Sequence, residues 1–338
     1  MLLSSRENIT IRKNNTSKSE KLIEKFHFEK IKKLAMSLFR AVLIIGLSFV
    51  ILYPIFIKIS IAFKHRVDLY DPTVVLIPRN FTLENFKYVI ETMNYFQTML
   101  NSFLLSSGTM LLTTISCALA GYGFARFKFR GRNILFALVV LTILVPPQTI
   151  MVPTYLTYRN FDILGIIGLF NDGNGINLLG TYWPFFISSI TGMGLKAGLF
   201  IFIFRQFFKS FPNEIEDAAL VDGAGVIRTF YKIMLPNAVP AIITVMLFSF
   251  VWQWNDSYFT TMFLENAKVL SLQLQTVGSN IAHRLSTSSG GGVGAVDPSY
   301  ISMLVNTSVL LSILPLIVLY LFVQRHFVES VERTGIVG

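Results

Sequence analysis

The sequence predicts an all-α integral membrane protein with six transmembrane helices. Apolar residues make up 53% of the chain, and its mean hydropathy is +0.58. Charged residues make up only 14%, whereas about a quarter of the residues in a soluble domain are charged. The chain also contains six apolar runs, each close to the length of about 20 residues that a helix needs to cross a bilayer.

The first apolar run predicts a membrane anchor. It extends from residue 41 to residue 57 and continues to residue 63 beyond Lys58. The 40 residues before it are mostly polar and basic, and no small-residue cleavage site follows it, so an anchor is favoured over a signal peptide. The other five runs are 99–124, 134–156, 182–204, 238–254 and 301–323.

These runs predict four regions along the chain. A basic tail at 1–34 is expected to lie near anionic lipid. A first transmembrane helix at 35–63 follows, then a five-helix core at 98–323 with a long inner loop at 205–236, and a short tail at 324–338.

Lys and Arg are unequally distributed between the segments that join the runs. If the N-terminus is cytoplasmic, twenty of the 29 lie in inner segments and seven in outer segments. Cationic residues favour the cytoplasmic side of a membrane. Both termini are therefore expected in the cytoplasm of a bacterium or archaeon, with the chain in its cytoplasmic membrane. This asymmetry also accounts for the net charge of +10, so the charge does not indicate nucleic-acid binding.

Two features of the sequence argue against a cofactor or disulfide site. The single cysteine, Cys117, lies within an apolar run and is expected to be a packing residue. The glycine-rich outer segment at 286–298 is not followed by Gly-Lys-Ser/Thr, so it is not a phosphate-binding loop. We expect no cofactor bound directly, no metal site and no catalytic residue.

The inner loop at 205–236 has the pattern of two short helices joined by a turn. Pro212 suits the first turn of a helix, and Glu216 and Asp217 follow where the helix dipole favours acids. Gly223 can adopt the left-handed conformation that ends such a helix. An amphipathic segment then runs to Pro236, which is expected to break it. An ordinary loop lying on the membrane would also satisfy these local preferences.

The spacing of residues in this loop resembles the "EAA" loop of ABC importer permeases. Asp217, Ala218 and Ala219 are followed after three residues by Gly223, and after nine more by Ile-x-Leu-Pro. The family usually has Glu at the position of Asp217, and Glu216 precedes it here. The positions that the resemblance assigns to ATPase coupling are Glu216, Asp217, Ala218, Ala219, Gly223, Ile233, Leu235 and Pro236.

Other segments resemble the carbohydrate branch of the same MetI-like family, in particular the smaller, six-span permease of maltose-type importers. These segments are Ala118–Arg132, Phe204–Phe208, Trp254–Asp256, Phe322–Phe327 and Gly335–Gly338. The resemblance implies a second homologous permease, two ATPase subunits that use ATP and Mg²⁺, and an extracellular solute-binding protein as partners. It implies that this chain is not itself an enzyme, and that its loop acts as a coupling helix that switches the permease between two states.

Five residues in or near the spans are candidates for the solute path: Gln148, Lys196, Gln253, Trp254 and Asn255. A cation near mid-membrane costs about 2.5–3.5 kcal/mol, but nearby glycines favour a broken helix that leaves Lys196 near water. Two prolines should break the helix before Gln148, and broken helices often line a cavity. The amides and Trp254 suit sugar recognition, although an interfacial aromatic belt explains them as well.

Two alternatives remain open at the level of the sequence. A secondary carrier would typically show two similar halves and acids within the spans, and neither is evident. An ABC permease for amino acids or peptides would share the coupling loop. The segments outside that loop favour a sugar or oligosaccharide, without naming which one.

Overall fold

The chain is helical in the computed structural model, which describes residues 3–265, 267–288 and 297–335. Within these residues the only β-type pairings are two isolated antiparallel bridges, Lys64–Phe81 and Phe161–Ile176. The predicted all-α class is therefore confirmed for the described chain. Most of the predicted glycine-rich loop at 286–298 lies outside the described residues. So do residues 336–338 of the predicted C-terminal tail.

The helices of the first half are α1 Leu3–Phe63, a 3₁₀ helix Arg66–Tyr70, α2 Glu84–Met93, α3 Tyr95–Arg126, α4 Arg132–Leu144, α5 Pro147–Arg159, α6 Ile166–Phe170 and α7 Trp183–Ile190. Those of the second half are α8 Ala197–Ser210, α9 Glu214–Val221, α10 Val226–Thr229, a π-helical turn Phe230–Met234, α11 Leu235–Asn237, α12 Val239–Asn255, α13 Tyr258–Phe263, α14 Leu270–Ser288 and α15 Pro298–Gly335.

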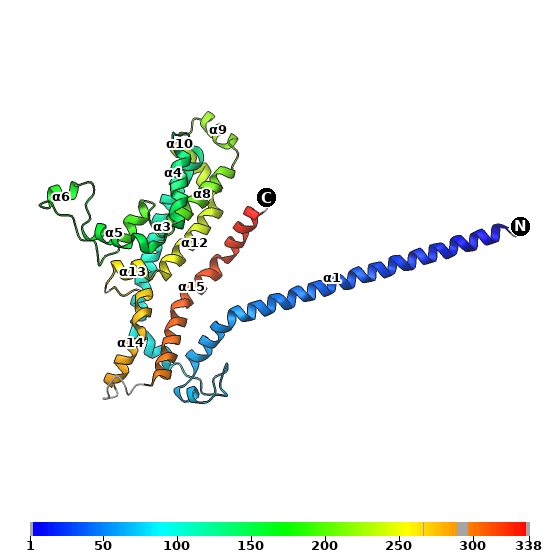
Figure 1. Ribbon diagram of the computed structural model, residues 1–338, viewed down its shortest axis with the longest axis horizontal. Helices are drawn as coiled ribbons and strands as arrows, with labels where there is room; N and C mark the ends of the chain where they lie inside the picture. The colour runs from blue at the N-terminus through cyan, green and yellow to red at the C-terminus, as the bar shows by residue number, and fades with distance from the viewer. Residues whose placement is uncertain (1–2, 266, 289–296, 336–338) are drawn as a thin grey trace. The chain divides into compact units, whose positions relative to one another are not determined.

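The chain divides into two compact units, Met1–Ser60 with Val75–Ile77, and Ile61–Val74 with Pro78–Gly338. The first unit consists mainly of α1, one continuous helix drawn in blue in Figure 1. Large apolar side chains along it are exposed, including Leu34 at 72%, Val50 at 68% and Ile51 at 70%. A helix that exposes apolar side chains in this way requires lipid or another protein around it. The helix also continues through the predicted basic tail.

Three helical segments are long and apolar enough to cross a membrane without a break: Glu29–Phe63, Tyr95–Arg126 and Pro298–Arg325. Two bent pairs raise the number to five, α4 with α5 at 103° and Val226–Asn237 with α12 at 78°. The fourth apolar run, 182–204, is divided between α7 and α8. The structure thus supports three to five spans among the described residues, where six were expected.

The helix breaks have local causes in the sequence. Pro146 and Pro147 lie at the bend between α4 and α5. Pro147 is the first residue of α5, a position whose N–H makes no hydrogen bond within the helix, so proline is tolerated there. Gly192 and Lys196 both have positive φ, at 70° and 59°, between α7 and α8. Lys196 is exposed at the start of α8. Both breaks expected from the sequence are therefore present.

One half of the second unit is built around α3, α8 and α12, which lie side by side (Figure 1). Phe200, Phe204 and Phe208 on α8 are fully buried in the apolar cluster between them, together with Cys117. Gly121 allows α3 to approach α8, because a Cβ there would lie 2.5 Å from the Cβ of Phe204. The packing role expected of Cys117 is confirmed.

A second apolar cluster joins α2, α12, α14 and α15. Val89, Ile281 and Leu304 are fully buried in it. Trp254, at the end of α12, packs into this cluster and donates its indole N–H to the Ser312 carbonyl at 3.3 Å. The Trp254 side chain is therefore committed to the core of this unit.

Candidate functional site

The helix α9 is fixed to the end of α3 by a charged contact. Tyr122 donates to Glu216 Oε1 at 2.7 Å, and Arg126 Nε lies 3.4 Å from Glu216 Oε2. Arg126 also donates to the Phe211 carbonyl at 2.8 Å and to the Asn213 side chain. The Arg126 and Glu216 side chains are only 7% and 16% exposed, so solvent screens this pair less than a surface ion pair.

The ends of α9 follow the expectations from the sequence, except at Pro212. The Asn213 carbonyl accepts hydrogen bonds from the N–H groups of Glu216 and Asp217, both at 3.0 Å, and the helix starts at Glu214. Pro212 lies two residues before the helix and not in its first turn, where it was expected. Three acids lie in its first turn, where the helix dipole stabilises them. Gly223 has φ of +76° just after the helix end. The predicted acidic start and left-handed glycine stop are confirmed.

The loop presents an apolar surface to solvent. Val221 is 87% exposed, Ile227 79% and Tyr231 51%. Of the two alanines assigned to coupling by the resemblance, Ala218 is exposed, whereas Ala219 is buried within the chain. An exposed apolar patch of this kind, next to acids on α9, marks a surface that another protein can cover.

The second half of the loop differs in detail from the expectation. Phe230 and Ile233 are half-buried, and the Phe230 ring packs against Tyr122 at 4.9 Å between centroids. Pro236 lies within α11 and does not break the chain itself. The helix direction changes two residues later, at Ala238, between α11 and α12.

The motif positions are thus divided between surface and packing. Asp217, Ala218, Gly223 and Pro236 are exposed. The other four positions are packed against the chain: Ala219 is buried, and Glu216, Ile233 and Leu235 are half-buried.

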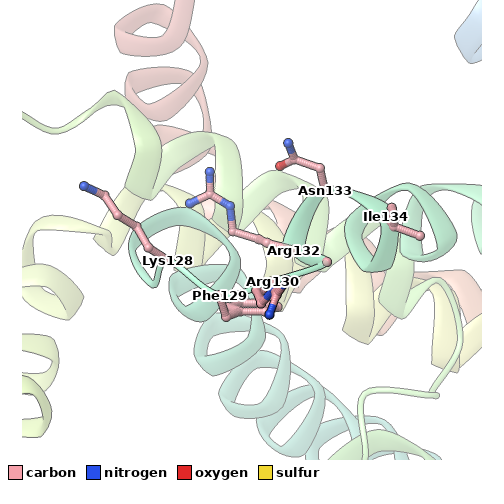
Figure 2. A pocket seen from close by; sticks show the side chains of 7 residues that line it. Lys128, Phe129, Arg130, Arg132, Asn133 and Ile134 are labelled. Carbon is pink, nitrogen blue, oxygen red and sulfur yellow. The ribbon is translucent and has the colours of Figure 1, made fainter.

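A basic turn joins α3 to α4 on the same side of the unit as α9 and α10. Residues 128–134 line a hollow of about 510 Å³, and Figure 2 shows Lys128, Arg130 and Arg132 around it. The Arg205 guanidinium lies 3.8 Å from the ring centroid of Phe136 on α4, and its Nε donates to the Phe124 carbonyl at 3.4 Å. Cations therefore gather between the end of α3 and the start of α4, close to Arg205 on α8.

A cavity of about 360 Å³ lies at the C-terminal end of α12, beside Gln253 and Asp256. It is bounded by α5, α7, the segment after α7, the end of α12 and α13. Its aromatic and polar lining residues are Tyr158, Phe185, Phe259, Phe263, Thr154, Thr157, Ser188, Ser189, Gln253 and Asp256. Its size lies in the lower part of the range of about 300–1,000 Å³ found for small-molecule sites.

Gln253 is the residue of the predicted solute path that lines this cavity. It is only 7% exposed, and in the part of the chain that the structure describes its Nε2 has no hydrogen-bond partner. Trp254 packs into the core on another side of α12, and Asn255 is exposed with its amide on the Val251 carbonyl at 2.9 Å. The path roles of Trp254 and Asn255 stay predictions.

The two remaining path candidates lie outside the cavity lining. Lys196 is exposed, with Nζ 6.0 Å from the ring centroid of Trp252. Gln148 is exposed near the start of α5. Sequence reasoning missed Tyr158, Ser188 and Asp256, because they come from separate segments. The only signal for Asp256 was an acid directly after the amides at the end of an apolar run.

No group of three or more His, Cys, Asp or Glu side chains among the described residues is arranged to hold a metal ion. Long apolar helices and an anchored two-helix loop with exposed apolar side chains define the class, a multi-span membrane protein. The family described as "Binding-protein-dependent transport system inner membrane component" matches residues 113–333, more than half of the chain. The chain belongs to this family.

Curated relatives match most of the chain. Protein LplC of Bacillus subtilis (strain 168) is 27% identical over 296 residues, covering 87% of this chain and 92% of that protein. Arabinooligosaccharides transport system permease protein AraQ of the same organism is 26% identical over 318 residues, covering 91% and 97%. Melibiose/raffinose/stachyose import permease protein MelC, also of that organism, is 25% identical, covering 84% and 91%.

A solved structure supports the fold. A chain of "a bacterial ABC transporter involved in the import of the acidic polysaccharide alginate" superposes with a TM-score of 0.68, at 20% sequence identity. The match covers 86% of this chain and 96% of that chain. At this level of identity the likeness concerns the fold.

Proposed function

We propose that this chain is a permease subunit of an ATP-driven, binding-protein-dependent importer of sugars or oligosaccharides. Its family consists of inner membrane components of binding-protein-dependent transport systems. Relatives with a printed substrate are named for arabinooligosaccharides, for melibiose, raffinose and stachyose, and for polygalacturonan and rhamnogalacturonan. The chain would form half of the translocation path beside a second, homologous permease.

The proposed coupling element is the loop from α9 to α11. Its exposed apolar side chains Val221, Ile227 and Tyr231 would dock on an ATPase subunit, with Asp217 and Ala218 at the same surface. The contact of Glu216 with Tyr122 and Arg126 would transmit movement of the docked loop to α3. This anchored helix with an apolar exposed surface is the observation that carries the proposal.

The proposed topology has six crossings. These are α1, α3, the bent pair α4–α5, the broken pair α7–α8, the bent segment from α11 to α12, and α15. The basic turn at 128–134 and the coupling loop would lie in the cytoplasm with both termini, in agreement with the tendency of cations to stay inside. The cell would be a bacterium or archaeon. ATP and Mg²⁺ would be bound by the ATPase partners and not by this chain.

The test is co-purification from mildly solubilised membranes, with the bound chains identified by mass spectrometry. The native chain is expected to retain a second permease and an ATPase. Ala218→Arg places a charge on the exposed docking surface and should release the ATPase, whereas Ala218→Ser, as a matched control, should retain it. Retention of the ATPase by Ala218→Arg, or its absence from the native preparation, would contradict the proposed coupling.

A further inference from the structure

The cavity at the outer end of α12, defined above, combines the two kinds of surface that sugars contact. Phe259 is half-buried and leaves part of its ring accessible from the cavity, while Tyr158 and Phe185 form buried walls. Aromatic rings pack against the C–H faces of a sugar, and a few fixed polar groups give such a site its specificity.

Gln253 supplies a buried amide nitrogen that has no hydrogen-bond partner among the described residues. Its side chain is buried, lines the cavity, and has an Nε2 without a hydrogen-bond partner in the described structure. A buried amide left without a partner costs about 1–3 kcal/mol. A ligand hydroxyl or ring oxygen in the cavity would remove that cost by accepting the N–H of Gln253.

The other polar groups hold the cavity walls in place. Asp256 Oδ2 accepts the N–H and the hydroxyl of Thr260, each at 2.9 Å, and so fixes α13 with Phe259. Tyr158 and Ser188 share a hydrogen bond of 2.6 Å between α5 and α7. The walls are therefore preorganised by contacts between segments that are distant in sequence, which lowers the cost of binding.

The charge of the lining selects among sugars. Asp256 is the only ionisable acid in it, and no Lys or Arg is among the lining residues that the structure describes. A uronic acid would bring a carboxylate beside Asp256 without a cation to balance it, and burying an unpaired charge is costly. A neutral sugar meets no such penalty.

We propose that this cavity binds a ring of a neutral oligosaccharide during transport, with Gln253 donating a hydrogen bond to it and Phe259 packing on its C–H face. The inference rests on the proposed function, and it names a substrate class and a contact residue for it. Gln253 is thereby a binding residue, and Asp256 and Tyr158 are positioning residues.

The test measures protection of a cysteine inside the cavity of the complete importer. Thr157→Cys places a thiol on the cavity lining, and the native Cys117 is fully buried, so its background labelling is low. The rate of labelling by N-ethylmaleimide is measured alone and with raffinose, arabinotriose or trigalacturonate. The ratio of the labelling rate without sugar to the rate with sugar equals 1 + [L]/Kd, where [L] is the sugar concentration. A sugar at about ten times its Kd therefore slows labelling about elevenfold.

We expect raffinose or arabinotriose to slow labelling at Thr157→Cys but not at Thr276→Cys, on the exposed face of α14. Adding Gln253→Leu should remove most of the protection, measured against that variant's own labelling rate in the absence of sugar. Gln97→Leu makes the same chemical change at an exposed site of α3 and should leave protection intact.

Failure of the inference and failure of the proposed function are distinguished in the same preparation. Protection by neither neutral sugar, full protection in Gln253→Leu, or protection by trigalacturonate alone overturns the inference while ATP-dependent sugar uptake persists. Absence of ATP-dependent uptake of any sugar overturns the proposed function itself.

Discussion

The inner loop and the outer cavity are built in opposite ways. At the inner loop, charged side chains are paired internally, with Glu216 on Tyr122 and Arg126, and apolar side chains such as Val221 face solvent. At the outer cavity, aromatic side chains are buried and an amide, Gln253, is left without a partner in the described chain. The first arrangement suits a protein partner, and the second suits a small polar ligand.

The difference concerns how each site is specified along the chain. The inner loop is a continuous segment in which α9 starts at Glu214, Gly223 follows its end, and the chain bends at Ala238 before α12. The outer cavity is assembled from α5, α7, α12 and α13, which are separated by loops and breaks. A substitution in the loop should therefore affect only the local structure of that segment. The effect of a substitution in the cavity should depend on the packing of several segments.

The largest effect is expected at Gly223. Its φ of +76° is closed to proline, so Gly223→Pro must rebuild the turn after α9, at a cost of about 3 kcal/mol or more. We expect uptake by the reconstituted importer to fall by about two orders of magnitude, since 1.4 kcal/mol is a factor of ten. Gly225→Ala is the control, because Gly225 has negative φ and open space around it. Equal uptake by the two variants would show that the turn does not couple.

The next effect concerns the anchor of α9. Glu216→Ala removes the acceptor of Tyr122 and the ion partner of Arg126, and hydrogen bonds to charged groups contribute about 1.5–3 kcal/mol. We expect a lower free energy of unfolding and ATP hydrolysis that no longer responds to substrate. Glu214→Ala, at an exposed acid of the same turn, is the control.

A double-mutant cycle with Tyr122→Phe separates the anchor from general damage to α9. Residues in contact typically show a coupling energy of about 0.5–3 kcal/mol. Additive effects of Glu216→Ala and Tyr122→Phe would mean that the contact does not stabilise the loop.

A smaller effect is expected where α3 crosses α8, between the two regions. A Cβ at Gly121 would lie 2.5 Å from the Cβ of Phe204 and 2.9 Å from the backbone nitrogen of Arg205. Gly121→Ala should therefore destabilise the chain by about 1–3 kcal/mol through overpacking. At Gly123 the nearest atom would be 3.9 Å away, so Gly123→Ala should be tolerated. Thermal unfolding of the two variants in detergent measures the difference, and a stable Gly121→Ala would refute the close crossing.

The smallest effect is a pH dependence in the loop that follows α1. Asp68 accepts the N–H of Asn80 at 2.9 Å, the N–H of Arg79 at 3.0 Å and the Asn80 side chain at 2.7 Å. The hydrogen bond from the Asn80 backbone is the main cause that lowers the pKa of Asp68 below its ordinary value of 3.8. The resulting stability is present above the ordinary pKa and is lost as the pH falls through the lower, folded pKa.

We therefore expect the amides of Arg79 and Asn80 to exchange hydrogen faster in acid than the intrinsic rates predict. Exchange followed by mass spectrometry on either side of pH 3.8 measures this. In Asp68→Asn, the exchange of these two amides should show little or no acceleration in acid beyond the intrinsic rates. Unchanged protection of the native loop in acid would contradict the role given to the Asp68 carboxylate.

The sequence predicted the local features of the fold because local residues determine them. Pro146 with Pro147, and Gly192 with Lys196, mark the two helix breaks, and Gly223 marks the end of α9. The bend before α12 was expected at Pro236 but lies at Ala238. Proline in the first turn of a short helix lets the helix continue, so Pro236 does not end it.

The outer cavity was not predictable as a unit from the sequence. Gln253 was found among the path candidates, but Tyr158 and Ser188 are ordinary residues in their own segments. Only tertiary packing brings them to the end of α12. In the same way, no local pattern separates the exposed Ala218 from the buried Ala219, because packing against the rest of the chain decides between neighbouring positions.

The most direct test of the account is uptake of labelled raffinose or arabinotriose into proteoliposomes that contain this chain with its second permease and ATPase. We predict uptake that requires ATP at the ATPase and the solute-binding protein on the opposite face, and that Ala218→Arg abolishes. Uptake driven by an ion gradient without ATP, and unaffected by Ala218→Arg, would contradict it and would identify a secondary carrier.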